Sequence, residues 1–208
     1  MTTHPFRRLP ALAGVLLATA LTFVVAACGS DSSSSGSDAG NGTDVAFIDE
    51  MTPHHQSAID MTKIADRRGK SGFVKRLATG IDKAQSSEIA TMRNIRSRLS
   101  GVQKTELGMS MGDMGMNMDD AMLNTATPFD RAFVDMMIPH HQGAIRMARV
   151  ELANGKNGQL RTLATSIVAA QSREISAMND FRTRTYGAPS PAGGVPKVGA
   201  SGMPGMNH

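Results

Sequence analysis

Apolar residues recur at spacings of three and four along four stretches of the chain, which is the period of an amphipathic α-helix. The faces of the first two stretches are formed by Phe47, Met51, His54, Ala58, Met61 and Ala65, and by Leu77, Ile81, Gln85, Glu88, Met92 and Ile95. Those of the last two are formed by Phe133, Met137, His140, Ala144 and Met147, and by Leu163, Ile167, Gln171, Glu174, Met178 and Phe181. The pattern predicts four helices that carry His, Gln and Glu on otherwise apolar faces.

The last two stretches repeat the first two at a constant offset. Phe47 and Phe133 lie 86 positions apart, and the same offset pairs His54 with His140. Both copies contain Pro-His-His-Gln, followed further on by Ala-Gln-Ser-Xaa-Glu-Ile-Xaa-Xaa-Met. Such a repeat indicates two related helical hairpins. Two hairpins joined by a long crossover predict a four-helix bundle, a fold that builds metal sites from side chains on facing helices.

The predicted domain covers residues 44–186. It divides into repeat 1 (44–100), a crossover (101–127) and repeat 2 (128–186). Glycines at 69 and 72, and at 155 and 158, indicate the turn within each hairpin. We expect Asp44 or Thr43 to cap the first helix, and Thr127 to cap the third with Pro128 at its first position.

One proline lies inside a helical pattern in each repeat. Pro53 and Pro139 each precede the two histidines of the motif. A proline at such a position removes the hydrogen bond to the carbonyl four residues earlier and kinks the helix. The alternative is a helix that starts at each proline, with a separate short helix before it.

The first 27 residues read as a lipoprotein signal peptide. Arg7 and Arg8 precede an apolar run that ends in Val25-Ala-Ala-Cys28, which resembles a bacterial lipobox and predicts lipidation of Cys28. The alternative is an uncleaved membrane anchor, for which the run is short. Residues 28–43 are rich in Ser, Gly and Asp and predict a flexible tether. Pro and Gly predict a disordered tail over 187–208, which contains Met203, Met206 and His208.

Composition restricts the partners and the metal-ligand types that this chain can use. The formal charge is +4 with Lys and Arg scattered, and no nucleic-acid motif occurs, so we expect no nucleic-acid partner. Cys28 is the single cysteine, which excludes a disulfide framework and a thiolate cluster within this sequence. A metal site must therefore use His, Met and carboxylate side chains.

The repeated polar residues have two interpretations. A carboxylate in a bundle interior is costly unless it is paired or bound to a cation. His54 and His140 lie on the helix faces that match those of Gln85, Glu88 and their repeat equivalents, so imidazole and carboxylate are expected to meet in the core. They would do so either as a structural pair or as metal ligands. His55 and His141 point about a third of a turn away, towards solvent, a neighbouring helix or a second ligand position. By periodicity alone, Met61 and Met147 are ordinary core residues.

The crossover carries an unusual concentration of methionine. Gly and Asp residues separate its six methionines, which are Met109, Met111, Met114, Met116, Met118 and Met122. The glycines argue against a packed helix and indicate exposed sulfurs in a flexible loop. Thioether sulfur is a soft ligand that suits Cu(I), whereas imidazole also suits Cu(II) and Zn(II). The alternatives are a Met-rich contact surface or low complexity without a site.

Phe133-Val-Asp-Met-Met-Ile-Pro-His-His-Gln-Gly-Ala-Ile-Arg-Met-Ala, together with Ala170-Gln-Ser-Arg-Glu-Ile, resembles the domain of unknown function 305 family. The resemblance covers roughly Asp44 to Arg184. It implies a ferritin-like helical fold found in bacterial envelope proteins, some of which bind copper and contribute to copper resistance. Repeat 1 departs from the pattern at Thr52 and Ser57, where repeat 2 has Ile138 and Gly143, which predicts a looser site in repeat 1.

Together these observations predict a lipid-anchored, extracytoplasmic copper-binding protein that buffers, chaperones or detoxifies copper, with Cu(I) favoured and Cu(II) as the alternative. The predicted ligands are His54, His55, Met61, His140, His141 and Met147 in the helices, and Met109, Met111, Met114, Met116 and Met118 in the crossover. We expect no enzymatic turnover. The rival functions are a metal oxidase, disfavoured because Glu-Xaa-Xaa-His is missing from the sequence, and an interaction module with a structural His–Glu seam. The oligomeric state is left open.

Overall fold

The computed structural model describes residues 39–197 of the chain. Four α-helices and one short 3-10 helix occur in this range: α1 (Gly42–Arg68), α2 (Gly72–Arg98), η1 (Asp120–Asn124), α3 (Phe129–Asn154) and α4 (Gly158–Tyr186). The predicted signal peptide, Cys28, most of the tether, and the residues Met203, Met206 and His208 lie outside the described part.

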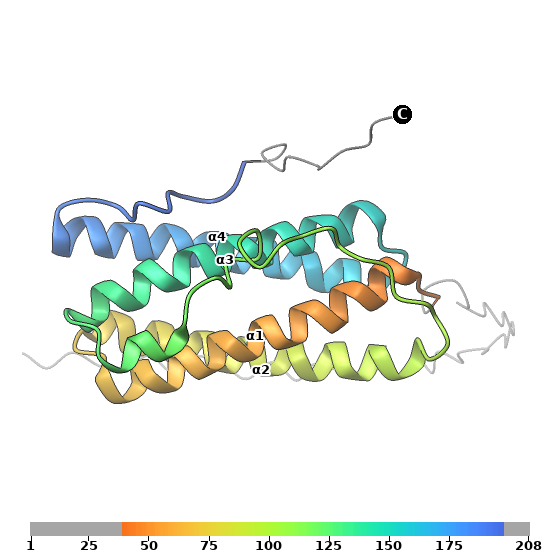
Figure 1. The fold of residues 1–208 in the computed structure, drawn as a ribbon, viewed down its shortest axis with the longest axis horizontal. Helices are drawn as coiled ribbons and strands as arrows, with labels where there is room; N and C mark the ends of the chain where they lie inside the picture. Colours follow the sequence, from red (N-terminus) through yellow and green to blue (C-terminus); the bar gives the residue numbers. More distant parts are fainter. Residues whose placement is uncertain (1–38, 198–208) are drawn as a thin grey trace, which may run out of the picture. The chain divides into compact units, whose positions relative to one another are not determined.

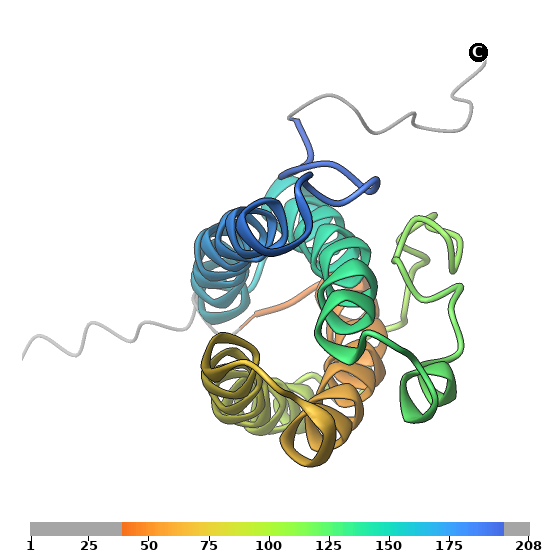
Figure 2. The ribbon, with the colours of Figure 1, turned by 90° about the vertical axis from the view of Figure 1, so that its left-hand side faces the viewer.

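The helices form two antiparallel hairpins, α1 with α2 and α3 with α4, packed into one bundle (Figures 1 and 2). The predicted all-α, ferritin-like four-helix bundle is confirmed. Its two hairpins follow the 86-residue offset, because α1 ends at Arg68 and α3 at Asn154, while α2 begins at Gly72 and α4 at Gly158. The crossover runs along the outer side of α1 and α3 (Figure 2).

The helix starts differ from those expected. Asn41, not Thr43 or Asp44, caps α1, since its side chain accepts hydrogen bonds from the backbone of both those residues. Pro128 is the N-cap of α3 and makes no side-chain capping bond, so the predicted cap at Thr127 is wrong by one position. Sequence patterns locate helix ends only to within a residue or two.

Both prolines lie inside continuous helices. Pro53 is in α1 and Pro139 in α3, so the alternative of a separate helix that starts at each proline is wrong. The two histidines that follow each proline are consequently held on the fourth turn of a long helix, near its mid-length.

A carboxylate at the start of each hairpin binds the turn of the other hairpin. Asp44 at the start of α1 accepts hydrogen bonds from the backbone N–H groups of Lys156 and Asn157 in the α3–α4 turn. Asp130 at the start of α3 accepts them from Lys70 and Ser71 in the α1–α2 turn. The two repeats are thus joined reciprocally at both ends of the bundle.

The core divides in the same reciprocal way. One buried cluster contains Met61 and Ile81 of repeat 1 with Phe133 and Met178 of repeat 2. The other contains their repeat equivalents, Phe47, Met92, Met147 and Ile167. Each cluster therefore combines the open end of one hairpin, where its first helix starts and its second helix ends, with the turn end of the other hairpin. No helix among residues 39–197 is long and apolar enough to span a membrane.

The first part of the predicted disordered tail is an ordered strap. Residues 187–197 follow α4 and run back over α3 and α4 (Figure 1). Gln142 donates hydrogen bonds to the carbonyls of Ala192 and Gly194, at 2.8 and 2.7 Å. Arg182 donates to the carbonyls of Ala188 and Pro189. The prediction of disorder is corrected for these residues because side chains of the helices satisfy their backbone groups; residues 198–208 lie outside the described part.

Candidate metal centre

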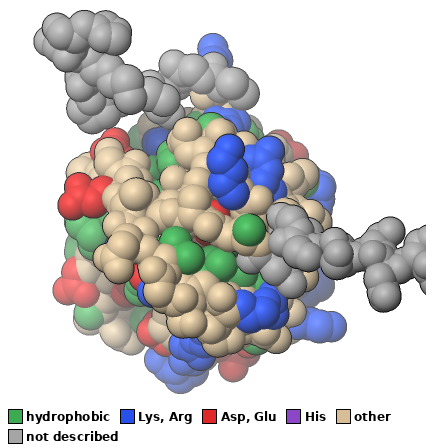
Figure 3. All heavy atoms as spheres, turned by 90° about the vertical axis from the view of Figure 1, so that its right-hand side faces the viewer, with side chains coloured by type: hydrophobic (Ala, Val, Ile, Leu, Met, Phe, Trp, Pro, Cys, Tyr) green, Lys and Arg blue, Asp and Glu red, His purple; other side chains and the backbone are tan. Residues whose placement is uncertain are grey.

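The four motif histidines lie in the bundle interior. Their side chains are buried, with relative exposures between 0 and 2%. The rings of His54 on α1 and His140 on α3 meet with their centroids 3.8 Å apart. On the end face of the bundle drawn in Figure 3, no His side chain is visible among the described residues, in keeping with this burial.

The outer two histidines, not the inner two, meet the glutamates. His55 Nε2 lies 2.6 Å from Glu88 Oε2, and His141 Nε2 lies 2.7 Å from Glu174 Oε2. The expectation that His54 and His140 would face these carboxylates is therefore wrong. The physical reason is rotation about the helix: one residue further along α1 or α3 turns the ring towards the partner helix of the same hairpin.

The inner histidines differ in their bonding. Nε2 of His54 lies 2.9 Å from the backbone carbonyl oxygen of Met114 in the crossover, so it donates a hydrogen bond there. Neither ring nitrogen of His140 has a hydrogen-bond partner, although both are buried. Most buried polar atoms that lack a partner belong to the repeated His and Gln positions. Groups of this kind are expensive in a core unless something binds them.

Both inner histidines are neutral at physiological pH. Burial, and to a smaller extent the neighbouring His55, lower the pKa of His54 to about 3. Burial also holds the pKa of His140 well below 6.5, with the adjacent His54 acting in the same direction. A neutral imidazole has a free lone pair, which is the form that binds a metal ion.

The crossover packs tightly against α3 beside His140. A Cβ atom added at Gly143 would lie 1.8 Å from the Met114 carbonyl oxygen, and one at Gly115 would lie 2.1 Å from the Pro139 carbonyl oxygen. Gly115 also has a φ of 69°, in the region that favours glycine. The flexible loop expected from the sequence is therefore, at these positions, a segment in direct backbone contact with a helix.

This packing separates the six crossover methionines into three kinds. Met109 and Met114 are half-buried against one core cluster. Met111 and Met122 are exposed at 54 and 62%. The remaining two, Met116 and Met118, line a pocket, and Met118 is also 40% exposed. The expectation of uniformly exposed sulfurs thus holds for some positions only.

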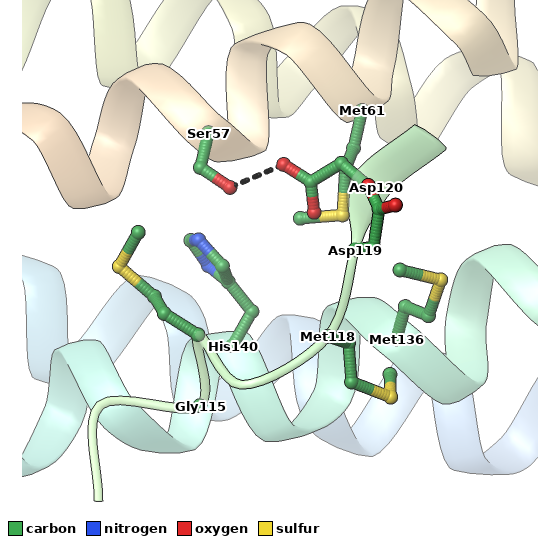
Figure 4. A pocket seen from close by; sticks show the side chains of 9 residues that line it. Ser57, Met61, Gly115, Met118, Asp119, Asp120, Met136 and His140 are labelled. Carbon is green, nitrogen blue, oxygen red and sulfur yellow. Dashed lines mark hydrogen bonds between the residues drawn. The ribbon is translucent and has the colours of Figure 1, made fainter. Parts of the chain in front are cut away.

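The pocket has a volume of about 270 Å³ and lies between α1, α3 and the crossover. Its sulfur-bearing lining consists of Met61, Met116, Met118 and Met136, and its polar lining consists of Ser57, Asp119, Asp120 and His140. Figure 4 shows the His140 ring and the labelled methionine side chains that line this pocket, with the Ser57 hydroxyl donating to Asp120 at 2.6 Å. Thioethers beside a neutral imidazole make a soft donor set, the kind that Cu(I) and Ag(I) prefer.

The structure brings some predicted ligands together and keeps others apart. Met61, Met116, Met118 and His140 share the pocket, whereas Met147 is buried in a core cluster. Among the described residues, no three His, Cys, Asp or Glu side chains group so that they could hold a metal ion. The sequence analysis missed Met136, whose neighbour Met137 was assigned to the core face; two methionines in succession next to the motif were the available signal.

Solved structures resemble this bundle over most of its length. CopM in a Cu(I)-bound form is 34% identical, with a TM-score of 0.60 over 69% of this chain and 97% of that one. CopM in a Cu(II)-bound form is 37% identical, with a TM-score of 0.62 over 69% of this chain and 97% of that one. CopM has also been crystallised in Ag-bound forms.

A DUF305 protein of Streptomyces coelicolor that is predicted to be secreted is 28% identical, with a TM-score of 0.63 over 72% of this chain and 95% of that one. The uncharacterized protein L153 of Acanthamoeba polyphaga mimivirus is 38% identical over 52 residues, which span 25% of this chain and 34% of the viral protein. The model of the domain of unknown function DUF305 matches residues 44–182, which is most of the described bundle. The chain therefore belongs to the DUF305 family.

Proposed function

We propose that this protein binds copper as Cu(I) in the pocket beside His140. The observation that supports the proposal most directly is the juxtaposition of four thioether side chains with a buried imidazole whose two nitrogens have no partner. The similarity to CopM, which has been crystallised with Cu(I), Cu(II) and Ag, supports the same choice of metal.

The donor set explains the preference for a soft ion. Sulfur from Met61, Met116, Met118 or Met136 binds Cu(I) through a polarisable lone pair and carries no charge that a proton competes for. His140 contributes a neutral nitrogen. Asp119 and Asp120 at the pocket add negative charge that attracts a cation. Cu(II) binding, which favours nitrogen and oxygen, is the alternative at the same place.

The proposed role is capture and holding of copper in the cell envelope, for buffering, delivery or resistance, without catalytic turnover. A predicted lipobox ending at Cys28 supports attachment to the membrane through a lipid. A family member predicted to be secreted supports a location outside the cytoplasm. The proposed partners are copper ions and the membrane that carries the anchor.

The proposal is tested by removing sulfur without changing volume. A variant with Met116→Leu, Met118→Leu and Met136→Leu keeps the apolar bulk of the pocket, since Met and Leu exchange at small cost. We expect its affinity for Cu(I) and Ag(I) to fall about 100-fold, measured by competition with a chromogenic chelator, because each lost sulfur removes a direct bond to the ion.

A matched control carries Met109→Leu, Met111→Leu and Met122→Leu, the same chemical change at crossover positions outside the pocket. Its affinity is expected to stay within about threefold of the unmodified protein, since these sulfurs do not face His140. Equal losses in the two variants would show that the crossover binds copper as a chain of sulfurs without regard to its fold, and the pocket would then be rejected as the site.

A further inference from the structure

The strap binds to a groove between α3 and α4 through its backbone. Nη1 of Arg182 on α4 donates to the carbonyls of Ala188 and Pro189, at 2.6 and 2.7 Å. Nε of the same guanidinium donates to Asp135 on α3 at 2.6 Å, and this ion pair fixes the orientation of the guanidinium. The Asp–Arg pair that joins the two helices therefore also provides the donor that holds the peptide.

A second residue of α4 holds a turn of the strap. Asn179 accepts a hydrogen bond from the N–H of Ser190 and donates one to the carbonyl of Gly193, both at 2.8 Å. Between these two strap residues the chain turns back, and the Gly193 N–H donates to the Ser190 carbonyl at 2.9 Å. The turn reads Ser-Pro-Ala-Gly, and a tight turn favours Ser, Asn or Asp at its first position, Pro at its second and Gly at its fourth. The groove of repeat 2 is thus a site for a proline-containing turn.

The equivalent groove of repeat 1 is a pocket of about 290 Å³ between α1 and α2. It is lined by Ile48, Asp49, Thr52, Pro53, Arg93 and Arg96. The 86-residue offset makes Asp49 and Arg96 the equivalents of the ion pair that holds the strap. It makes Arg93 the equivalent of Asn179, which holds the turn. The pocket therefore lies where repeat 2 binds its peptide.

Two polar groups in this repeat 1 groove have no partner among the described residues. Arg96 donates to Asp49 through Nε at 2.8 Å, as the equivalent pair does in repeat 2, but its Nη1 makes no hydrogen bond with the described part of the chain. Oγ1 of Thr52 is buried without a partner, at a position where repeat 2 has Ile138. A buried hydroxyl that bonds to nothing is costly, and a bound peptide group would satisfy it.

We propose that the repeat 1 groove binds a proline-containing turn of another protein, with the sequence Asp-Pro-Xaa-Gly. The occupied groove of repeat 2 is the template for the backbone contacts: Nη1 of Arg96 donates to a carbonyl just before the turn, as Arg182 does to Pro189. The inference is independent of copper binding, because this groove shares no lining residue with the pocket beside His140.

Arg93 in place of Asn179 specifies the acidic residue. An amide both donates and accepts, whereas a guanidinium only donates, so Arg93 offers no acceptor to the N–H at the start of a turn. An aspartate at that first position instead presents a carboxylate to the guanidinium and is a residue type that the turn favours. Because Asp49 neutralises Arg96, Arg93 leaves the groove lining with a net positive charge that complements this carboxylate.

Two fluorescein-labelled peptides test the proposal against the full chain, by fluorescence anisotropy at low ionic strength. The Ser peptide has the sequence of residues 187–196, and the Asp peptide has the same sequence with Ser190→Asp. We expect the Asp peptide to bind with a dissociation constant of about 100 µM. The Ser peptide should bind about fivefold more weakly, because it lacks the carboxylate that pairs with Arg93.

Arg93→Asn gives the repeat 1 groove the residue of repeat 2, and Arg76→Asn is the matched control. Both arginines are exposed on α2, and only Arg93 lines the groove. Arg93→Asn is expected to reduce the affinity for the Asp peptide about fivefold, to that for the Ser peptide, while Arg76→Asn changes it by less than about twofold. Circular dichroism verifies that both variants keep their helices.

Three results would each overturn the proposal. An Asp peptide that fails to saturate the protein up to about 1 mM would exclude the groove as a site for this turn. Equal affinities of the two arginine variants for the Asp peptide would place the peptide elsewhere on the bundle. Tighter binding of the Ser peptide than of the Asp peptide would make the strap of a second copy the preferred occupant.

Discussion

The two repeats have equivalent helices and place the motif histidines, glutamines and glutamates at the same positions, yet their central histidines differ in hydrogen bonding. His54 is hydrogen-bonded to the crossover, whereas His140 faces a pocket with both nitrogens free of partners. The helices do not account for this difference. The crossover does, because it is a single segment that passes over a symmetric pair of helices and must meet each of them with different residues.

Two further equivalent pairs show the same effect. Glu50 forms an ion pair with Lys104 of the crossover at 3.2 Å, whereas its equivalent, Met136, lines the pocket. Ser57 bonds to Asp120, whereas its equivalent, Gly143, contacts the Met114 carbonyl. The comparison teaches that a duplicated scaffold supplies two potential sites, and that the unduplicated connection decides which of them becomes a pocket.

The largest effect is expected from making repeat 2 resemble repeat 1 at the contact between Gly143 and the Met114 carbonyl. Gly143→Ser places a side chain where only 1.8 Å separates a Cβ atom from the Met114 carbonyl oxygen, so the crossover must move away from α3. We expect a loss of about 2 kcal/mol in the free energy of unfolding, measured with urea. Ag(I) affinity should fall at least about tenfold, because Met116 and Met118 move with the crossover.

Gly80→Ala is the control for that change. No atom outside its own helix lies within 4 Å of a Cβ built at Gly80, which is exposed within α2. This variant should be more stable by about 0.5–1 kcal/mol, since alanine favours a helix interior. If Gly143→Ser were tolerated as well as Gly80→Ala, the crossover would not be held by this contact.

A smaller effect concerns a buried acid that repeat 1 lacks. Glu151 stands where repeat 1 has Ala65, and its carboxyl oxygens meet no donor group. Burial, together with the adjacent Asp44, to which a protonated Glu151 donates, raises the pKa of Glu151 to about 8. Because the folded state prefers the protonated acid, the contribution of Glu151 to stability is constant below about pH 4.5 and declines as the pH rises from about 4.5 to about 8.

Glu151→Gln keeps the shape of the side chain, and its amide N–H can donate to Asp44 at every pH. We expect its melting temperature to exceed that of the unmodified protein by roughly 5 °C at pH 8.5, and the difference to vanish near pH 4.5. Calorimetry at both pH values measures this. The histidines titrate alike in the two proteins, so their contribution cancels in the difference. A difference that is independent of pH would mean that Glu151 ionises in the ordinary range.

The smallest expected effect concerns the pH dependence of Ag(I) affinity, which should be absent. Because burial keeps the pKa of His140 well below 6.5, no proton has to leave it when a metal binds between pH 7.5 and 5.5. Ag(I) affinity should therefore stay constant over this range, by calorimetric titration. A ligand histidine with an ordinary pKa would lose about tenfold in affinity at pH 5.5, and such a loss would exclude His140 as the proposed nitrogen ligand.

Much of this architecture could be predicted from the sequence because it depends on local periodicity. The faces from Phe47 to Ala65 and from Phe133 to Met147, and the glycine turns, specify helices and their pairing without reference to distant residues. The pocket could not be predicted, because it depends on where the crossover lies. Nothing local distinguishes Met116 from Met111 until the packing of Gly115 and Gly143 positions the segment, and the helical period that places Met137 on the core face gives no reason to select Met136.

The reciprocal bonds of Asp44 and Asp130 bear on how the bundle is organised. Each hairpin turn presents two backbone N–H groups that only the other hairpin's carboxylate satisfies. A single repeat on its own would bury neither those donors nor its half of each core cluster, and would regain both by associating with a second copy about a twofold axis. The bundle thus has the organisation of a homodimer of hairpins within one chain, and the crossover is the segment that connects the two halves.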